Sequence, residues 1–196
     1  DISEQLEYFA RRDLLTGLYN RNYLFEQIEA RRKEIEGEDG ESGALLLLEI
    51  LNHDEIKRYI GTTGMDNLLT EFGKSVEERV GGQGLVARHG AFSFLILLGR
   101  LDRQRTAELA GALNELARDY VFSQGTTSVT VLTSAGYLVL DENSPPNAAE
   151  LVDRVERASN RAAQDGDYLA RLYEPDIKTA SEREQDEAWA RKIKTA

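Results

Sequence analysis

Apolar residues recur along this chain with two different spacings. Helical spacing, at i, i+3, i+4 and i+7, predicts helices over residues 2–12, 20–36, 54–59, 65–80, 101–120 and 148–164. The nearly continuous apolar run at 44–51 predicts a strand that is buried on both faces. Further strands are expected at 84–87, 95–98, 128–141 and 168–173. This order predicts an α/β fold, an α+β sandwich in which helices flank one central mixed sheet of about five strands.

The two ends of the chain differ from this body. Ile2, Leu6 and Phe9 form an apolar stripe on the first helix, which we expect to pack against the domain or against a second copy. Residues 181–194 are predicted to form a charged helix that contains the only tryptophan, Trp189. Such a helix buries little of itself, so we expect a connector to a further module. The alternative is a solvated terminal helix.

Composition narrows the class of protein. A chain of 196 residues without cysteine suits one α/β domain in a reducing cytoplasm, and it has no thiolate metal site and no disulfide. No apolar run is long enough to cross a bilayer. The net charge of −11 argues against a nucleic-acid-binding surface and favours protein partners.

The turn between the strands at 84–87 and 95–98 carries an unusual sequence. From Arg88 to Phe94 it is Arg-His-Gly-Ala-Phe-Ser-Phe. The apolar flanks predict a hairpin, which places Phe92 at its tip. An aromatic side chain there either anchors a partner or folds back and fills a pocket, and the sequence leaves both open.

Residues 13–21, Asp-Leu-Leu-Thr-Gly-Leu-Tyr-Asn-Arg, are predicted to form a turn in which Asn20 caps the next helix. This stretch resembles the opening signature of GGDEF domains, the diguanylate cyclases that join two GTP molecules into cyclic di-GMP. The element order that follows, and the closing segment at 151–175, agree with that family. Tyr19 departs from the pattern, because the family has proline there. The resemblance implies the GGDEF fold, which is nucleotidyl-cyclase-like.

The resemblance also implies a two-metal reaction, in which carboxylates at the end of the first strand and in the hairpin turn hold divalent cations. The first-strand acidic positions fall at Glu49 and Leu51. The five-residue signature reads Gly90, Ala91, Phe92, Ser93 and Phe94. Neither of its two acidic positions keeps a carboxylate, so we expect a degenerate signature and no metal, with Glu49 as a relic candidate ligand.

The nucleotide-contacting positions that the family implies have changed as well. The guanine-contacting asparagine falls at Lys57, whereas its partner aspartate is kept as Asp66, so both are possible relics of a nucleotide site. The phosphate-binding lysine and arginine fall at Ala163 and Asp167. A carboxylate beside a triphosphate replaces attraction with repulsion. The arginine and aspartate of the product-inhibition motif fall at 81 and 84, which are both glycine.

Each of these residues also has a plain structural explanation. Glu49 is more simply a solvated or arginine-paired carboxylate than a metal ligand. Asp66 is more simply a helix cap than a guanine contact. His53 and His89 have too few acidic residues near them in the sequence to be proposed as a catalytic or metal-binding pair.

Taken together, these residues predict a catalytically inactive GGDEF-like regulatory domain, and so a chain that is not an enzyme and needs no cofactor. Residues 182–196 are similar to the linker helix that joins GGDEF to EAL domains, the phosphodiesterase or receptor modules of cyclic di-GMP signalling. FimX-like regulators of type IV pili resemble this arrangement. We therefore divide the chain into an N-terminal signalling helix (1–12), a degenerate GGDEF domain (13–175) and a linker helix (176–196).

The expected partners are an adjacent EAL domain or another protein, and a second copy of the chain, with no nucleic acid and no membrane. Two alternatives stay open. The domain could bind GTP weakly and regulate its neighbour without turning the nucleotide over, or it could be a residual diguanylate cyclase that uses Glu49.

Overall fold

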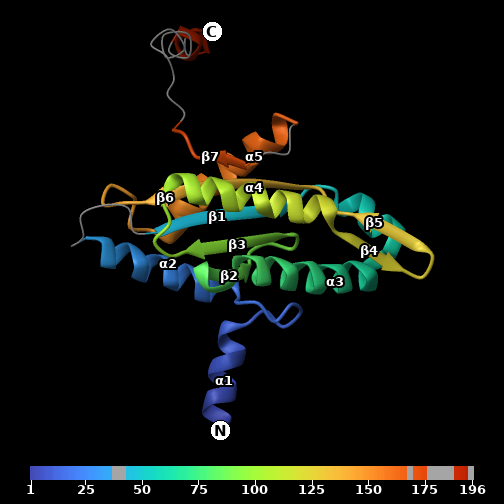
Figure 1. Cartoon of the computed structure of the whole chain (residues 1–196). Helices are drawn as coiled ribbons and strands as arrows, with labels where there is room; N and C mark the ends of the chain where they lie inside the picture. Colours follow the sequence, from blue (N-terminus) through green and yellow to red (C-terminus); the bar gives the residue numbers. More distant parts are fainter. Residues whose placement is uncertain (37–42, 167–169, 176–187, 194–196) are drawn as a thin grey trace.

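The computed structural model describes residues 1–36, 43–166, 170–175 and 188–193 (Figure 1). Its helices are α1 (Ile2–Arg11), α2 (Arg21–Ile35), α3 (His53–Val80), α4 (Arg103–Asp119) and α5 (Ala148–Gln164), with a 3-10 turn at Gly81–Gln83. The strands are β1 (Gly43–Ile50), β2 (Gly84–Arg88), β3 (Ser93–Leu98), β4 (Val121–Gln124), β5 (Thr127–Thr130), β6 (Thr133–Leu140) and β7 (Ala170–Leu172).

Five of the strands form one mixed sheet in the order β2-β3-β1-β6-β7. All neighbours are antiparallel except β6 and β7, which are parallel. This arrangement confirms the predicted fold class. Strand β1 lies at the centre, and residues 44–48 are fully buried because helices cover both faces of the sheet.

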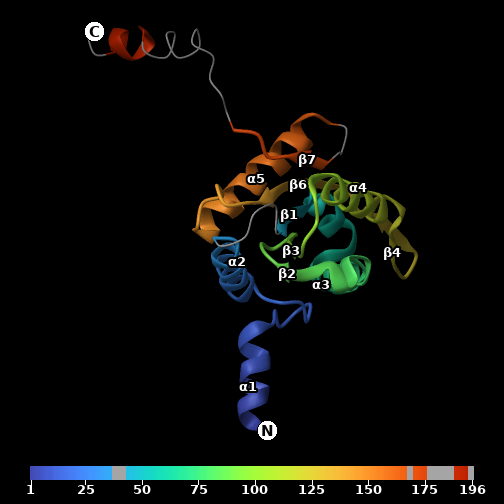
Figure 2. The ribbon, with the colours of Figure 1, turned by 60° about the vertical axis from the view of Figure 1, so that its left-hand side comes forward.

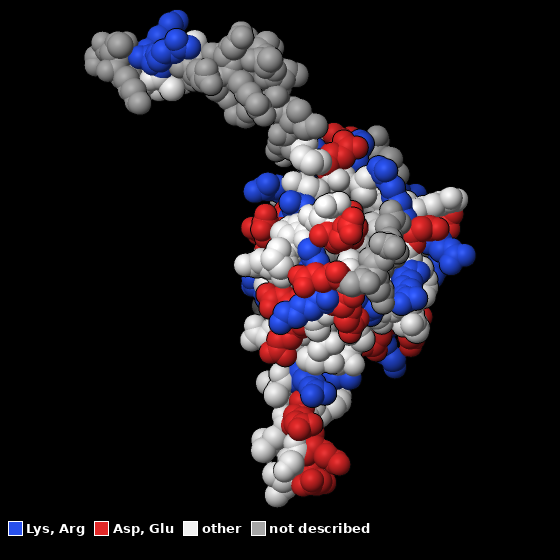
Figure 3. All heavy atoms as spheres, turned by 90° about the vertical axis from the view of Figure 1, so that its left-hand side faces the viewer, with Lys and Arg blue, Asp and Glu red and all other residues white. Residues whose placement is uncertain are grey.

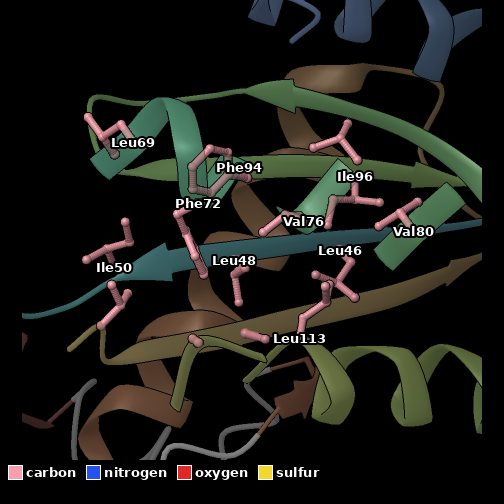
Figure 4. Packing of buried hydrophobic residues seen from close by; sticks show 14 of the residues in the cluster. Leu46, Leu48, Ile50, Leu69, Phe72, Val76, Val80, Phe94, Ile96 and Leu113 are labelled. Carbon is pink, nitrogen blue, oxygen red and sulfur yellow. The ribbon is translucent and has the colours of Figure 1, made fainter. Parts of the chain in front are cut away.

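The two faces of the sheet belong to separate apolar clusters. Leu46, Leu48 and Phe94 face α3 and α4, where they pack with Phe72 and Leu113 (Figure 4). Alternate residues of the same strands face α2 and α5. The two-residue repeat of a strand thus divides a continuous apolar run between two cores.

The helices expected at 54–59 and 65–80 are the two parts of α3, which is broken at Gly61, where a φ of 73° interrupts the helical geometry. One predicted element differs from that in the structure. The single strand expected at 128–141 is two strands, β5 and β6. The first of them pairs with β4 in a separate two-stranded hairpin. Propensity could not separate them, because residues 131–132 between them are as apolar as the strands.

Helix α1 projects away from the body in both ribbon views (Figures 1 and 2), and none of its residues is buried. Its base is held through Asn20, which caps α2 by accepting a hydrogen bond from the N–H of Tyr23 at 2.9 Å. The Asn20 side chain also donates to the carbonyl oxygen of Ala10 at 2.8 Å. The predicted cap is therefore confirmed, and it also ties α1 to α2.

At the other end of the chain, residues 188–193 are helical, and Trp189 is exposed. The rest of the helix predicted at 181–194 lies outside the described residues. So do residues 168–169 of the last predicted strand, whose remainder forms β7. Among the described helices, none is both long and apolar enough to cross a membrane.

Candidate functional site at the hairpin tip

The β2–β3 hairpin turns through residues 89–92, and its own side chains hold the turn closed. The N–H of His89 donates to the carbonyl oxygen of Ser93 at 2.9 Å. The N–H of Gly90 donates to the Ser93 hydroxyl at 2.8 Å. Ser93 is buried and therefore serves the turn itself, whereas Ala91 at the tip is exposed.

Phe92 folds back from the tip toward α3. Its ring stacks on His53, the first residue of α3, with ring centroids 4.1 Å apart and planes 6° from parallel. The Phe92 side chain is partly buried and packs against the core cluster under α3 and α4. The structure therefore shows the second of the two arrangements left open for Phe92, in which it closes against the body.

On the opposite face of the sheet, Glu49 is surrounded by small hydroxyl side chains. In the register of the sheet it lies between Ser93 of β3 and Ser134 of β6. Ser134 shares a hydrogen bond of 2.9 Å with Ser159 of α5. Burial raises the pKa of Glu49, and a hydrogen bond from Ser159 opposes part of that rise.

His89 ties the hairpin to α5 beside Glu49. Its Nε2 atom lies 2.8 Å from Oε1 of Glu156, and its ring stacks on Phe25 of α2 at 6.1 Å. The sequence shows no acidic residue near His89 along the chain, but the fold brings one beside it. Glu156 follows 67 positions later in the sequence, and only the packing of α5 on the sheet brings the two together.

Arg88 connects this hairpin to the turn at 13–21. Its Nη1 atom lies 3.5 Å from the carboxylate of Asp13, and its Nη2 donates to the carbonyl oxygen of Ala91 at 2.9 Å. The N–H of Arg88 also donates to the carbonyl oxygen of Tyr19 at 3.0 Å. One side chain thus joins the base of α1 to the tip of the hairpin.

Tyr19 adds an aromatic contact to that connection. The guanidinium of Arg12 lies 3.9 Å from the centroid of its ring, and Tyr8 of α1 lies on the same guanidinium at 5.2 Å. Tyr23 of α2 packs on Tyr19 at 4.7 Å. Such cation–π contacts stabilise by about 0.5–1 kcal/mol at exposed sites, so Tyr19 favours one orientation of α1.

The predicted nucleotide-contacting residues are spread along two helices. Lys57 is exposed in the first part of α3, before the break at Gly61. Asp66 lies inside the second part of α3, and its carbonyl oxygen accepts a bond from the Thr70 hydroxyl. The preferred interpretation of Asp66 as a helix cap is therefore wrong, because Asp66 lies more than one turn past the break at Gly61 and not at the start of the second part.

The remaining predicted positions lie at the margins of the fold. Ala163 is in the last turn of α5, and Asp167 lies outside the described residues. Gly81 is the first residue of the 3-10 turn, and Gly84 is the first residue of β2. A Cβ atom at Gly84 would lie 2.3 Å from the carbonyl oxygen of Leu97, so close packing of β2 on β3 explains that glycine.

Comparison with known proteins now identifies the family. The family described as "Diguanylate cyclase, GGDEF domain" matches residues 10–168. The chain belongs to the GGDEF family. Among curated relatives, an uncharacterised protein of Mycobacterium tuberculosis is 25% identical over 186 residues, which is 93% of this chain. The match spans only 29% of that relative, so the GGDEF domain corresponds to a small part of a longer protein there.

Solved structures share the GGDEF fold. The coiled coil and GGDEF domain of DgcB from Caulobacter crescentus, in complex with c-di-GMP, has a TM-score of 0.79 at 17% identity and covers 87% of this chain and 90% of its own. Diguanylate cyclase SiaD from Pseudomonas aeruginosa, in complex with its activator SiaC, has a TM-score of 0.77 at 23% identity, covering 88% and 65%. The FimX GGDEF domain from the same species has a TM-score of 0.74 at 22% identity, covering 83% and 98%.

These comparisons correct one prediction. The chain was predicted not to be an enzyme, but the family that matches most of its length is that of the diguanylate cyclases, and SiaD among its structural neighbours is one. The chain is a GGDEF domain of the cyclic di-GMP signalling family. Substituted site residues alone do not remove it from a family of enzymes.

The two-metal site that this GGDEF family implies can be tested against the donor set. Glu49 is the one carboxylate at the positions considered, since Leu51, Phe92 and Ser93 supply none. The described residues contain no group of three or more His, Cys, Asp or Glu side chains arranged to hold a metal ion. Two hard divalent cations need several oxygen ligands, so this donor set does not fit a two-ion centre.

Sequence reasoning missed the residues that connect the hairpin to its surroundings. Arg88, Glu156 and Ser159 were not singled out, because their partners lie far away in the sequence. Strand register offered a signal for part of this. Glu49 near the end of β1 must have a neighbour on each adjacent strand, and serines stand at both of those positions.

Proposed function

We propose that this GGDEF domain is a regulatory module of a cyclic di-GMP signalling protein, which couples its N-terminal helix to an adjacent module. The observation that carries this proposal is the double contact of Arg88, with Asp13 on one side and the carbonyl oxygen of Ala91 on the other. A change in the orientation of α1 acts on Asp13 and is passed to the hairpin tip through a single side chain.

The charge distribution of α1 supports this role. Acidic side chains lie toward its free end and basic ones where it joins the body (Figure 3). Its apolar residues Ile2, Leu6 and Phe9 are exposed, so the helix offers a stripe that a second α1 or an upstream segment could cover.

The division of the chain belongs to the same proposal. Residues 1–12 form the signalling helix, residues 13–175 the GGDEF domain with its degenerate signature, and residues 176–196 the linker helix toward an EAL domain. The match to the relative from Mycobacterium tuberculosis covers 29% of that protein, so the rest of its length is long enough to contain such a module.

The test forces α1 to pair and measures the response of the hairpin. A parallel two-stranded coiled coil is fused in helical register before α1 of the whole chain, and hydrogen exchange is followed at residues 89–93. We expect the exchange rates there to change by about tenfold or more, which corresponds to about 1.4 kcal/mol. Arg88→Gln should abolish the response. Arg79→Gln, in the last turn of α3, is the matched control and should preserve it. An unchanged response in Arg88→Gln would refute the coupling.

Diguanylate cyclase activity is the second candidate, and the family match favours it. It is measured by incubating the whole chain with GTP and Mg²⁺ and quantifying cyclic di-GMP by chromatography. Product that disappears in Glu49→Gln but persists in Glu156→Gln would assign turnover to Glu49. Calorimetry with GTP on the same samples separates binding from turnover and tests the GTP-binding alternative, with Asp66→Asn as the site variant.

A further inference from the structure

A hollow of about 300 Å³ lies at the end of the sheet away from the hairpin tip. Its walls are the last part of β6 with the loop that follows it, the end of β7, the start of α4 and the second turn of α5, which meet at the same end of the molecule (Figure 1). None of the residues discussed for the hairpin site or for α1 lines this hollow.

The floor of the hollow is an unpaired stretch of sheet edge. Strand β7 pairs with β6 only from Ala135 to Tyr137, and the last main-chain bond between them runs from the N–H of Tyr173 to the carbonyl oxygen of Tyr137. Because N–H and C=O groups alternate in direction along a strand, those of Val139 point to the same side as those of Tyr137. No described residue bonds to them on that side.

Two arginines flank this open edge from opposite faces of the sheet. Arg103 begins α4, and Arg154 lies in the second turn of α5. Among the described residues, neither guanidinium forms an ion pair: Arg154 lies over the ring of Tyr173 at 5.2 Å, and Arg103 lies close enough to the Tyr137 hydroxyl to oppose the rise in its pKa that burial causes.

The one acidic residue in the lining is already engaged. The Asp141 carboxylate accepts hydrogen bonds from the N–H of Asn143 at 2.8 Å and from the Ser144 hydroxyl at 3.3 Å. It therefore holds the loop that follows β6 and forms no ion pair with either arginine, so two positive charges face one negative charge in the lining.

We propose that this notch binds an extended acidic peptide, which adds a short strand to the edge of β6 at Val139. Its main chain would bond to the N–H and C=O of Val139, as in β-strand addition elsewhere. Successive side chains of an extended peptide point to opposite faces of a sheet. Two adjacent acidic residues therefore reach Arg103 on one face and Arg154 on the other, whereas acidic residues separated by one position reach only one of them.

The experiment uses two peptides of identical composition, acetylated and amidated at their ends: Thr-Val-Glu-Glu-Val-Thr and Thr-Glu-Val-Glu-Val-Thr. Each is titrated into the ¹⁵N-labelled whole chain, and the Val139 amide resonance is followed. We expect the first peptide to shift that resonance and to bind at least about tenfold more tightly than the second. Equal affinity for both peptides, or no shift at Val139, would overturn the proposal.

Arginine variants and N-methylated peptides separate strand addition from general charge attraction. Arg103→Glu and Arg154→Glu should each weaken the first peptide about tenfold or more. Arg105→Glu and Arg157→Glu, exposed positions on the same two helices, should change it less than about twofold. In the first peptide, the main-chain N–H groups of the two adjacent glutamates point to opposite sides, so only one of them faces β6. Methylation of that nitrogen should abolish binding, whereas methylation of the other glutamate nitrogen should preserve it. Retained binding with both methylated peptides would refute a main-chain contact.

Discussion

The two sides of the hairpin tip are held by different chemistry. Toward α3, the contact is aromatic, with Phe92 stacked on His53. Toward α5, it is polar and partly buried, with His89 on Glu156 beside the carboxylate of Glu49. The GGDEF resemblance implies that this turn supplies metal ligands. In this chain the turn instead contacts α3 and α5 separately, so the tip is held from two sides by the chain itself.

This difference matters because the two contacts respond to different conditions. Stacked aromatic pairs contribute about 0.5–1.5 kcal/mol beyond the area they bury, and salt changes that little when both rings are neutral. A hydrogen bond to a charged group contributes about 1.5–3 kcal/mol and depends on charge. The α5 side should therefore be the stronger and the more sensitive of the two.

The largest effect should come from separating α5 from the sheet. A Cβ atom at Gly136 of β6 would lie 2.3 Å from the carbonyl oxygen of Val155 and 2.4 Å from the N–H nitrogen of Ser159, both in the backbone of α5. Gly136→Ala should therefore move α5 outward and destabilise the fold by about 3 kcal/mol. The loss is measured by urea unfolding.

Gly111 provides the matched control. It lies in α4, and a Cβ atom there would meet nothing within 4 Å. Gly111→Ala should stabilise the protein by about 0.5–1 kcal/mol, because alanine favours the helix. Similar destabilisation by both substitutions would show that the close approach of β6 and α5 is not what holds this side of the molecule.

The second effect concerns the hydrogen bond between His89 and Glu156. A double-mutant cycle of His89→Ala and Glu156→Ala should give a coupling free energy of about 1–2 kcal/mol, because His89 is largely shielded from water whereas Glu156 is 41% exposed and partly screened. The exposed pair Arg171 and Asp165 is the control, and its coupling should stay below about 1 kcal/mol. Equal couplings measured by urea unfolding would remove the distinction between the two sides of the hairpin.

The sequence predicted most of the fold and few of the contacts at this site. The apolar run of β1, the cap at Asn20 and the helix at 148–164 all depend on local spacing, which a sequence displays directly. The pairs of His89 with Glu156 and of Phe92 with His53 depend on how distant elements pack. Neither pairing is encoded by local spacing, so the two positions of Phe92 could not be distinguished from the sequence.

The third effect tests the aromatic side. Phe92→Ala and His53→Ala should show a coupling free energy of about 0.5–1.5 kcal/mol in urea unfolding, unchanged between low and high salt. Phe25 of α2, which stacks on His89 of the hairpin at a longer centroid distance of 6.1 Å, offers a second aromatic pair for comparison. A coupling that falls steeply with salt would mean that charge, and not stacking, holds Phe92 against α3.

The smallest effect concerns the charge of Glu49. Because burial raises the pKa of this carboxyl in the folded protein, the folded state binds its proton more tightly than the unfolded state does. The free energy of unfolding should therefore fall as pH rises from the ordinary carboxyl value through the raised one, and the full cost of burying the anion is present above both. Glu49→Gln removes that cost, so the variant should unfold at a higher temperature than the parent at pH 8. The difference should shrink as the pH falls to about 4, where the parent carboxyl is largely protonated.

Glu55→Gln, at an exposed glutamate near the start of α3, is the control and should show no such pH-dependent gain. If the gain in unfolding temperature of Glu49→Gln instead grew toward acid pH, attraction to His89 and not burial would govern the pKa of Glu49. The contact of the hairpin with α5 would then depend on the charge of this carboxylate.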